Sequence, residues 1–107
     1  MFARIVEFIP KMEKREEFVK VMRNKVLPIL KKQPGFMEIL PFEPETKTEK
    51  MICITLWTEK RDAERYEHEA YPKVDEILMP YLTTPVTFKH YNLETSLCQH
   101  FVEALTA

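Results

Sequence analysis

Two segments of the chain are apolar at nearly every position, and this feature constrains the fold more than any other. Residues 51–57 (MICITLW) and residues 2–9 (FARIVEFI) are rich in β-branched and aromatic side chains, which favours β-strands. Successive side chains of a strand point to opposite faces of its sheet, so such strands need both faces buried. Helices of a 107-residue chain can cover one face. A second copy of the chain is the simplest cover for the other face.

The segments between the predicted strands show the periodicity of helices. Residues 12–32 and residues 59–71 repeat apolar side chains at steps of three and four, which predicts two helices. Pro28 should kink the first helix or end it early, because proline lacks the N–H and clashes with the preceding turn. A further short helix is expected from Pro72 to Pro80, since proline suits the first position of a helix.

Two more strands complete the pattern. Residues 36–43 follow Gly35, whose freedom to adopt positive φ suits a helix-to-strand turn. Pro41 indicates that this strand lies at an edge or contains a bulge. Residues 85–94 predict the fourth strand. The chain is therefore predicted to be α+β, with a ferredoxin-like β-α-β-β-α-β order, a four-stranded antiparallel sheet and both helices on one face.

Composition excludes several classes of function. Sixteen basic and 17 acidic residues alternate in sign, so neither nucleic acid nor an anionic membrane is an expected partner. The single glycine excludes the glycine-rich loops that bind nucleotide phosphates. The two cysteines and three histidines show no zinc-site spacing, so no metal is expected, and Cys53 should be a buried, reduced thiol. There is no signal-peptide pattern and no apolar run near ~20 residues, which predicts a cytoplasmic protein.

Four aromatic residues are candidates for holding a ligand. Trp57 ends the third strand and could stack on an aromatic ring, or fill the junction between strand and helix. Tyr66, Tyr71 and Tyr81 lie on the inward side of the second helical region. A tyrosine hydroxyl in an apolar pocket could orient a phenolic substrate, with Tyr66 the principal candidate, or each ring could simply belong to the core.

Ionisable residues on the strands supply the remaining candidates. His90 lies on the fourth strand and could accept a proton from a phenol, or it could be a hydrogen-bonded interface residue. Arg4 and Glu7 alternate with apolar neighbours on the first strand, and Glu38 is a potential partner for either in a structural ion pair. Arg4 and Phe8 are expected to face the pocket and contact the substrate.

The sequence resembles the antibiotic biosynthesis monooxygenase family, which belongs to the dimeric α+β barrel superfamily. The residues that carry this resemblance are QPGF at 33–36, Trp57 at a strand end, and TEKRDAERY at 58–66. The resemblance covers residues 2–95 and implies a homodimer with a pocket between sheet and helices. Some members oxidise polyketide-type phenols with O₂ and no cofactor, and others cleave haem. The haem-site residues are not carried over, since Tyr66 replaces a tryptophan, Glu76 a histidine, and the first strand has no asparagine.

These observations predict one domain over residues 1–95 and a tail over residues 96–107, whose spacing of Leu97, Phe101 and Leu105 suits a short helix packed on the dimer. The function expected is that of a cofactor-free monooxygenase acting on a small apolar or phenolic, quinol-type molecule. The alternative is a homodimeric binding protein for a small hydrophobic metabolite, without catalysis. Haem degradation is the least favoured of the three.

Overall fold

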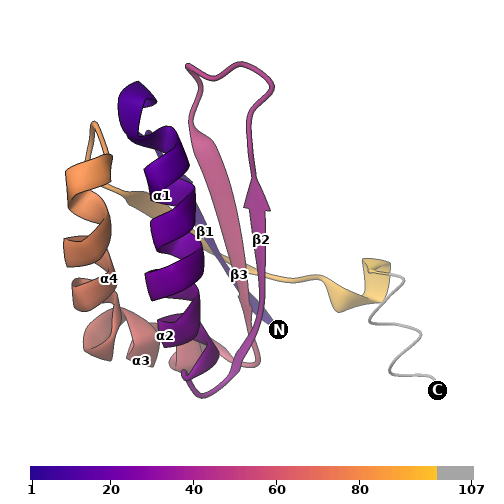
Figure 1. Cartoon of the computed structure of the whole chain (residues 1–107). Coiled ribbons are helices and arrows are strands. Elements are labelled where there is room, and N and C mark those ends of the chain that lie inside the picture. The colour runs from indigo at the N-terminus through magenta and orange to yellow at the C-terminus, as the bar shows by residue number, and fades with distance from the viewer. Residues whose placement is uncertain (99–107) are drawn as a thin grey trace.

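A four-stranded antiparallel sheet with its helices on one face forms the body of the protein. The computed structural model describes residues 1–98. Figure 1 shows both helical regions on the same side of the sheet. In chain order the main elements are β1 (Phe2–Phe8), α1 (Arg15–Val21), α2 (Leu27–Lys31), β2 (Phe36–Phe42), β3 (Met51–Trp57), α3 (Lys60–Glu69), α4 (Tyr71–Leu78) and β4 (Thr87–Asn92).

The strands lie in the order β2-β3-β1-β4, and every pair is antiparallel, which confirms the predicted fold class. The two apolar strands β1 and β3 are therefore central. β2 lies at an edge, as Pro41 indicates, and its register with β3 shifts between Phe36 and Glu38, whereas Pro41 itself is in regular register with Cys53. The register of β1 places Arg4 opposite Thr55 on one side and opposite His90 on the other.

The first helical region continues past Pro28 and does not end there. A short 3-10 turn, η1 (Met12–Lys14), leads into α1, and a π-helical segment, η2 (Met22–Val26), joins α1 to α2. Proline has no N–H to give to the turn before it, and its ring clashes with a carbonyl of that turn. A wider π turn relieves this clash, so the helix runs on to Lys31.

The second helical region breaks where the sequence predicts. Ala70 separates α3 from α4 with φ −114°, and Pro72 lies in the first turn of α4. The helix then tightens into a 3-10 turn, η3 (Met79–Tyr81), which contains Pro80. A last 3-10 turn, η4 (Thr95–Leu97), follows β4 and lies apart from the body in Figure 1. The predicted tail helix falls mainly on residues 99–107, outside the described residues.

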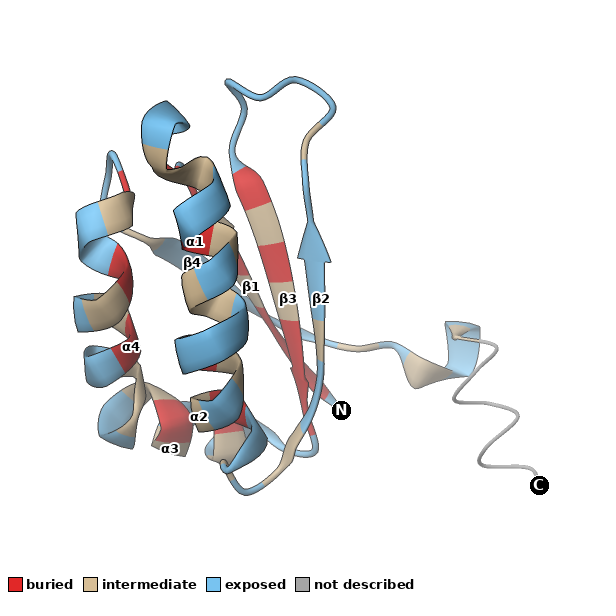
Figure 2. Ribbon diagram, viewed as in Figure 1, coloured by how far each residue is buried: buried red, intermediate tan, exposed pale blue. Residues whose placement is uncertain are grey.

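The two faces of the sheet differ sharply in burial. Figure 2 shows buried and half-buried residues alternating along β3, whereas β2 and β4 are largely exposed. Phe2, Val6 and Phe8 of β1 and the β3 residues paired with them point toward the helices and form the core. The opposite side, here named the outer face, is only partly covered by the described chain. Its half-buried or exposed apolar residues are Ile5, Leu40, Phe42, Ile52, Ile54 and Tyr91.

Gly35 makes the turn from α2 into β2. Its φ of +80° lies in the left-handed region, which a side chain with a Cβ adopts only at a cost. A Cβ at this position would also collide with the side chain of Asp62 at the start of α3. The Gly35 carbonyl accepts a hydrogen bond from the Thr58 N–H at 2.8 Å. One small residue therefore lets β2, β3 and α3 meet.

We expect Gly35→Ala to lower the free energy of unfolding by about 2 kcal/mol, because it combines backbone strain with a steric collision. Urea denaturation measures this change. The same substitution in an Asp62→Gly background should lose the collision and keep the backbone strain. Equal destabilisation in both backgrounds would show that Asp62 does not restrict this turn.

Candidate functional site

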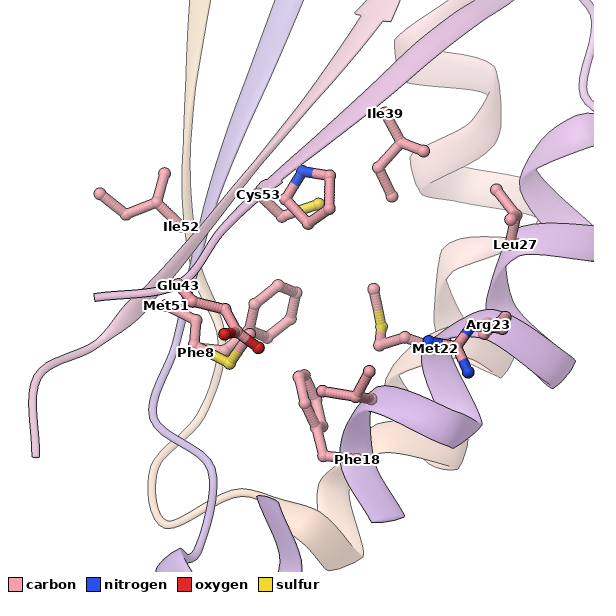
Figure 3. Close-up of a pocket in the computed structure, with 12 residues that line it drawn as sticks. Phe8, Phe18, Met22, Arg23, Leu27, Ile39, Glu43, Met51, Ile52 and Cys53 are labelled. Atoms are coloured by element: carbon pink, nitrogen blue, oxygen red, sulfur yellow. The ribbon is translucent and has the colours of Figure 1, made fainter. Parts of the chain in front are cut away.

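A pocket of about 400 Å³ lies between the first helical region and the sheet. We call it the helix–sheet pocket. In Figure 3 the side chains of Phe8, Phe18, Met22 and Cys53 converge on one space, whereas Ile52 points away from it. Its volume falls in the range of pockets that bind small organic molecules. The lining residues are Phe8, Phe18, Val19, Met22, Arg23, Leu27, Ile39, Pro41, Glu43, Met51, Ile52 and Cys53.

The local fold explains why a space remains here. On the helix side the pocket is lined by the apolar stripe of α1 and by the π-helical segment, which contributes Met22 and Arg23. On the sheet side it is lined by helix-facing residues of β1 and β3. The open side is β2, an edge strand whose Pro41 is exposed. Because the sheet ends at β2, no further strand fills the gap beside the helix.

Charged side chains stand only at the rim of the helix–sheet pocket. Arg23 comes from the helix side and Glu43 from the sheet side, and both are exposed. The other lining residues are apolar apart from the Cys53 thiol, and Phe8 and Phe18 pack with ring centroids 5.5 Å apart. Such walls favour an apolar ring over a charged or strongly hydrated molecule.

Cys53 forms part of the pocket wall as a free thiol, and its burial confirms the expected buried position. Burial raises the pKa of this thiol to about 12, and the positive charge of Arg4 opposes the shift only in part. The thiolate is the nucleophilic form of cysteine, so Cys53 contributes packing to the pocket and not reactivity.

A second, smaller cavity of about 20 Å³, here named the inner void, adjoins the helix–sheet pocket. Phe8, Met22, Ile39 and Cys53 line both cavities. Beyond these shared side chains the inner void is bounded by β1, β3, the helices and the guanidinium-bearing side chain of Arg4. Its remaining lining residues are Val6, Val26, Leu30, Thr55, Tyr66, Tyr71, Val74 and Leu78.

Arg4 is a buried charge, only 2% exposed. Its Nε donates a hydrogen bond to Glu67 Oε1 at 3.1 Å. Its guanidinium carbon lies 4.5 Å from the ring centroid of Tyr71 and 4.6 Å from that of Phe88, as in cation–π contacts. Its Nη2 is buried and has no hydrogen-bond partner among residues 1–98. The charge is therefore paired on one side and unsatisfied on the other.

Glu67 connects Arg4 to His90. The same Glu67 Oε1 lies 2.5 Å from His90 Nε2, while the rings of Phe2 and Phe88 pack around the imidazole. The ion pair predicted for Arg4 exists, but Glu38 as its partner was wrong. Twist and topology bring α3 over β1, which sequence spacing does not reveal.

Glu7 is the other charged residue of β1, and Glu38 is not its partner either. Lys50 Nζ lies 3.0 Å from Glu7 Oε2, and this contact lowers the pKa of Glu7. The carboxylate of Glu38 instead accepts the backbone N–H of its neighbour Ile39 at 3.1 Å.

The predicted aromatic residues separate into three environments. Trp57 is fully buried, donates its indole N–H to Thr55 Oγ1 at 3.0 Å, and packs 5.1 Å from the Tyr66 ring centroid, but it lines neither cavity. Tyr66 and Tyr71 line the inner void, where burial raises the pKa of both hydroxyls and the charge of Arg4 opposes it. Tyr81 lies elsewhere, with its ring near Lys14 Nζ.

The predicted site residues are therefore brought together only in part. Phe8 lines both cavities, and Arg4 lines the inner void. The His90 side chain is 31% exposed and lines neither cavity, although its Nε2 contacts Glu67, the partner of Arg4. The catalytic roles predicted for His90 and Tyr66 and the binding roles predicted for the other residues stay predictions.

Sequence reasoning missed most of the pocket wall. Phe18 and Met22 stood on the predicted apolar stripe, but that pattern is the same for a packed core and for a cavity wall. Arg23 and Glu43 carried no signal, since exposed charges are ordinary on helices and after strands. Arg23 and Glu43 are brought to one site only by the gap between the helix and the edge strand.

Within the described part of the chain, no three His, Cys, Asp or Glu side chains gather as a metal site would require. Among these residues there is also no helix with the length and apolar character needed to cross a bilayer.

The fold and the pocket define a ferredoxin-like α+β protein that holds its cavity between one helical layer and one sheet. The family model described as antibiotic biosynthesis monooxygenase matches residues 1–73. The chain belongs to the antibiotic biosynthesis monooxygenase family.

Several solved structures share this fold. SnoaB, a cofactor-independent oxygenase from Streptomyces nogalater, is 16% identical with a TM-score of 0.75, and the match covers 91% of this chain and 96% of that one. The ActVA-Orf6 monooxygenase from Streptomyces coelicolor, in complex with nanaomycin D, is 15% identical with a TM-score of 0.71, covering 87% of each chain. A conserved protein from Methanosarcina mazei is 16% identical with a TM-score of 0.70, covering 88% and 94%. A search of the curated proteins finds no match.

We expect Cys53 to resist alkylation in the folded protein. In a Cys98→Ser variant only Cys53 remains, and its pKa of about 12 in place of 9.0 makes the thiolate about a thousandfold scarcer at about pH 8. The rate of iodoacetamide labelling, followed by mass spectrometry, should therefore rise by about that factor when urea unfolds the chain. The native rate should increase as the pH approaches 12. Similar rates in folded and unfolded protein would contradict a buried thiol.

Proposed function

We propose that this protein is a cofactor-independent monooxygenase that binds a small apolar or phenolic ring compound in the helix–sheet pocket. The observation that carries the proposal is the pocket itself, an apolar cavity of about 400 Å³ with charges only at its rim. Membership of the family supports the reaction class. Two structures of the same fold, one of them with a bound ligand, are described as an oxygenase and a monooxygenase.

The reaction needs no electron donor beyond the substrate. A phenol with an unsubstituted ring carbon reacts with O₂ to give a quinone and water. One oxygen atom forms the new C=O bond, the other leaves as water with two hydrogens, and the four electrons that reduce O₂ come from the ring. For 1-naphthol the products are 1,4-naphthoquinone and one water.

The protein's contribution is position and environment. The apolar walls around Phe8, Phe18 and Met22 exclude water and hold the ring, which restricts the geometry of its meeting with O₂. The rim leaves a path through which the displaced proton reaches solvent.

A binding protein for a small hydrophobic metabolite is the second candidate. The observation that favours it is the lining of the helix–sheet pocket, which contains no histidine and no carboxylate other than Glu43 at its exposed rim. Such a pocket holds a ring without an evident proton acceptor beside it. This candidate predicts ligand-dependent thermal stabilisation with no consumption of O₂.

We expect the protein to consume O₂ when it is mixed with 1-naphthol, with one labelled oxygen atom appearing in the quinone. Leu27→Trp should lower the rate by about tenfold or more, because the indole fills the pocket beside the helix. Met12→Trp is the matched control, since Met12 is 67% exposed and lies outside the pocket, and it should keep the wild-type rate.

An oxygen electrode and mass spectrometry of the product distinguish the two candidates. If naphthols raise the melting temperature but no O₂ is consumed, the result would favour a binding protein and exclude the monooxygenase function. Because His90 lies outside both cavities, His90→Ala should keep the rate within about a factor of two. A loss of tenfold in this variant would instead support the proton-acceptor role predicted from the sequence.

We also propose that the protein is a homodimer closed through the outer face. The partly covered apolar residues of that face and the projecting η4, whose Leu97 is 83% exposed, support a second copy of the chain as the cover.

Sedimentation should give about twice 12.8 kDa for the wild type. Leu40→Asp on the outer face should shift the protein toward the monomer, because a carboxylate there would be buried without a partner. Met79→Asp introduces the same charge on the helical side, where Met79 is 60% exposed, and should leave the dimer intact. A wild-type monomer at micromolar concentration would exclude this assembly.

A further inference from the structure

The mouth of the helix–sheet pocket carries one charge of each sign. Arg23 belongs to the π-helical segment, and Glu43 directly follows the edge strand β2. In Figure 3 the two side chains extend toward the same space, one from the helix and one from the sheet. Both are exposed, and neither is ion-paired with another side chain among residues 1–98. Their charged ends can therefore contact a molecule that fills the pocket.

The rest of the lining offers a hydroxyl group no strong partner. Phe8 and Phe18 present hydrocarbon, Met22 presents a thioether, and the Cys53 thiol is only a weak donor and acceptor. A hydroxyl group placed against such walls would lose its hydrogen bonds to water and gain none in return, which weakens binding. A ring with one hydroxyl group is therefore held with its hydrocarbon edge inward and its oxygen at the mouth.

The two charges together select the kind of polar group that fits at the mouth. A carboxylate there is attracted by Arg23 and repelled by Glu43, and an ammonium group meets the reverse. A hydroxyl group gains from both, because its oxygen accepts an N–H of the guanidinium while its O–H donates to the carboxylate. A phenol has this combination of acceptor and donor, whereas an aryl methyl ether has only the acceptor and a plain hydrocarbon has neither.

We propose that Arg23 and Glu43 orient the substrate, with a phenolic hydroxyl between them that accepts a hydrogen bond from Arg23 and donates one to Glu43. This inference rests on the proposed function for the place of the ring, and it specifies the substrate class as a phenol whose opposite edge is unsubstituted. In 1-naphthol the carbon opposite the hydroxyl, where the second quinone oxygen forms, then lies inside the apolar pocket. When the phenol ionises, the electron pair of the O–H bond stays on the oxygen beside Arg23 and the proton leaves through the mouth to solvent.

Three ligands test this orientation with the wild-type protein under anaerobic conditions, where no substrate is consumed. Calorimetry should show 1-naphthol binding about fivefold tighter than naphthalene, because it gains two hydrogen bonds to charged groups at a solvated mouth. 1-Methoxynaphthalene should lie between the two, since its oxygen accepts a hydrogen bond and donates none. Leu27→Trp fills the pocket and should weaken the binding of all three by about tenfold or more.

The ionisation of bound 1-naphthol reports the two charges separately. The naphtholate absorbs at longer wavelength than the phenol, so absorbance follows its formation as the pH rises. Arg23→Met removes a positive charge beside the oxygen and should raise the pKa of the bound naphthol by about 0.5. Glu43→Gln removes a negative charge and should lower this pKa by about the same amount.

Matched controls remove the same charges from neighbouring positions. Lys25→Met changes an exposed residue of the same π-helical segment, and Glu45→Gln changes an exposed residue after the same strand. Neither residue lines the helix–sheet pocket. Each control should move the pKa of the bound naphthol by less than about 0.2 at 0.15 M salt, because solvent and salt screen charges that lie outside the mouth.

The outcomes distinguish this inference from the proposed reaction. Shifts of opposite sign in Arg23→Met and Glu43→Gln that exceed those in the controls support the orientation, even if no O₂ is consumed. Shifts of the same sign, a shift in only one variant, or shifts no larger than in the controls overturn it, even if O₂ uptake confirms the monooxygenase. Equal binding of 1-naphthol and naphthalene by the wild type also overturns it, as does failure of 1-naphthol to bind at about 1 mM or unchanged binding in Leu27→Trp.

Discussion

The buried charge of Arg4 is the interaction on which the arrangement of the second helical region depends. A guanidinium at the centre of a sheet has to be paired, because an isolated charge in an apolar interior costs many kcal/mol. Glu67 supplies that pairing from α3 and shares its carboxylate with His90 of β4. The faces of the guanidinium are covered by rings from α4 and β4. One residue of β1 thus connects three other elements through charge and aromatic contact.

The first helical region is organised by a different constraint. Pro28 cannot donate to the preceding turn, and the helix accommodates it with a π-helical segment that carries Met22 and Arg23 over the sheet. β2 ends the sheet on this side, and Pro41 has no backbone N–H to offer for pairing. Both features oppose close packing between α1, α2 and the sheet edge. The helix–sheet pocket lies between these two segments, which are far apart in the sequence.

The candidate site combines these two halves. The apolar cavity belongs to the first helical region, and the buried charge belongs to the second. Phe8 and Cys53 stand between them on adjacent central strands, with the Cys53 thiol held neutral by burial. The helix–sheet pocket is lined almost entirely by hydrocarbon, and the buried Arg4–Glu67 pair lies outside its lining.

Local patterns in the chain were enough to predict the fold class and nearly all the elements. Apolar strands, helical stripes, the Gly35 turn and the proline breaks are local patterns, and each is set by the backbone chemistry of a few neighbouring residues. Local pattern also indicated that Arg4 needed a partner and that Cys53 was buried. It did not show that the partner is Glu67, that His90 lies outside both cavities, or that Tyr81 stands apart from Tyr66 and Tyr71. These facts depend on sheet order, strand register and the position of α3 above β1. They could not be predicted, because contacts between distant segments are set by how whole elements pack and leave no periodicity in the chain.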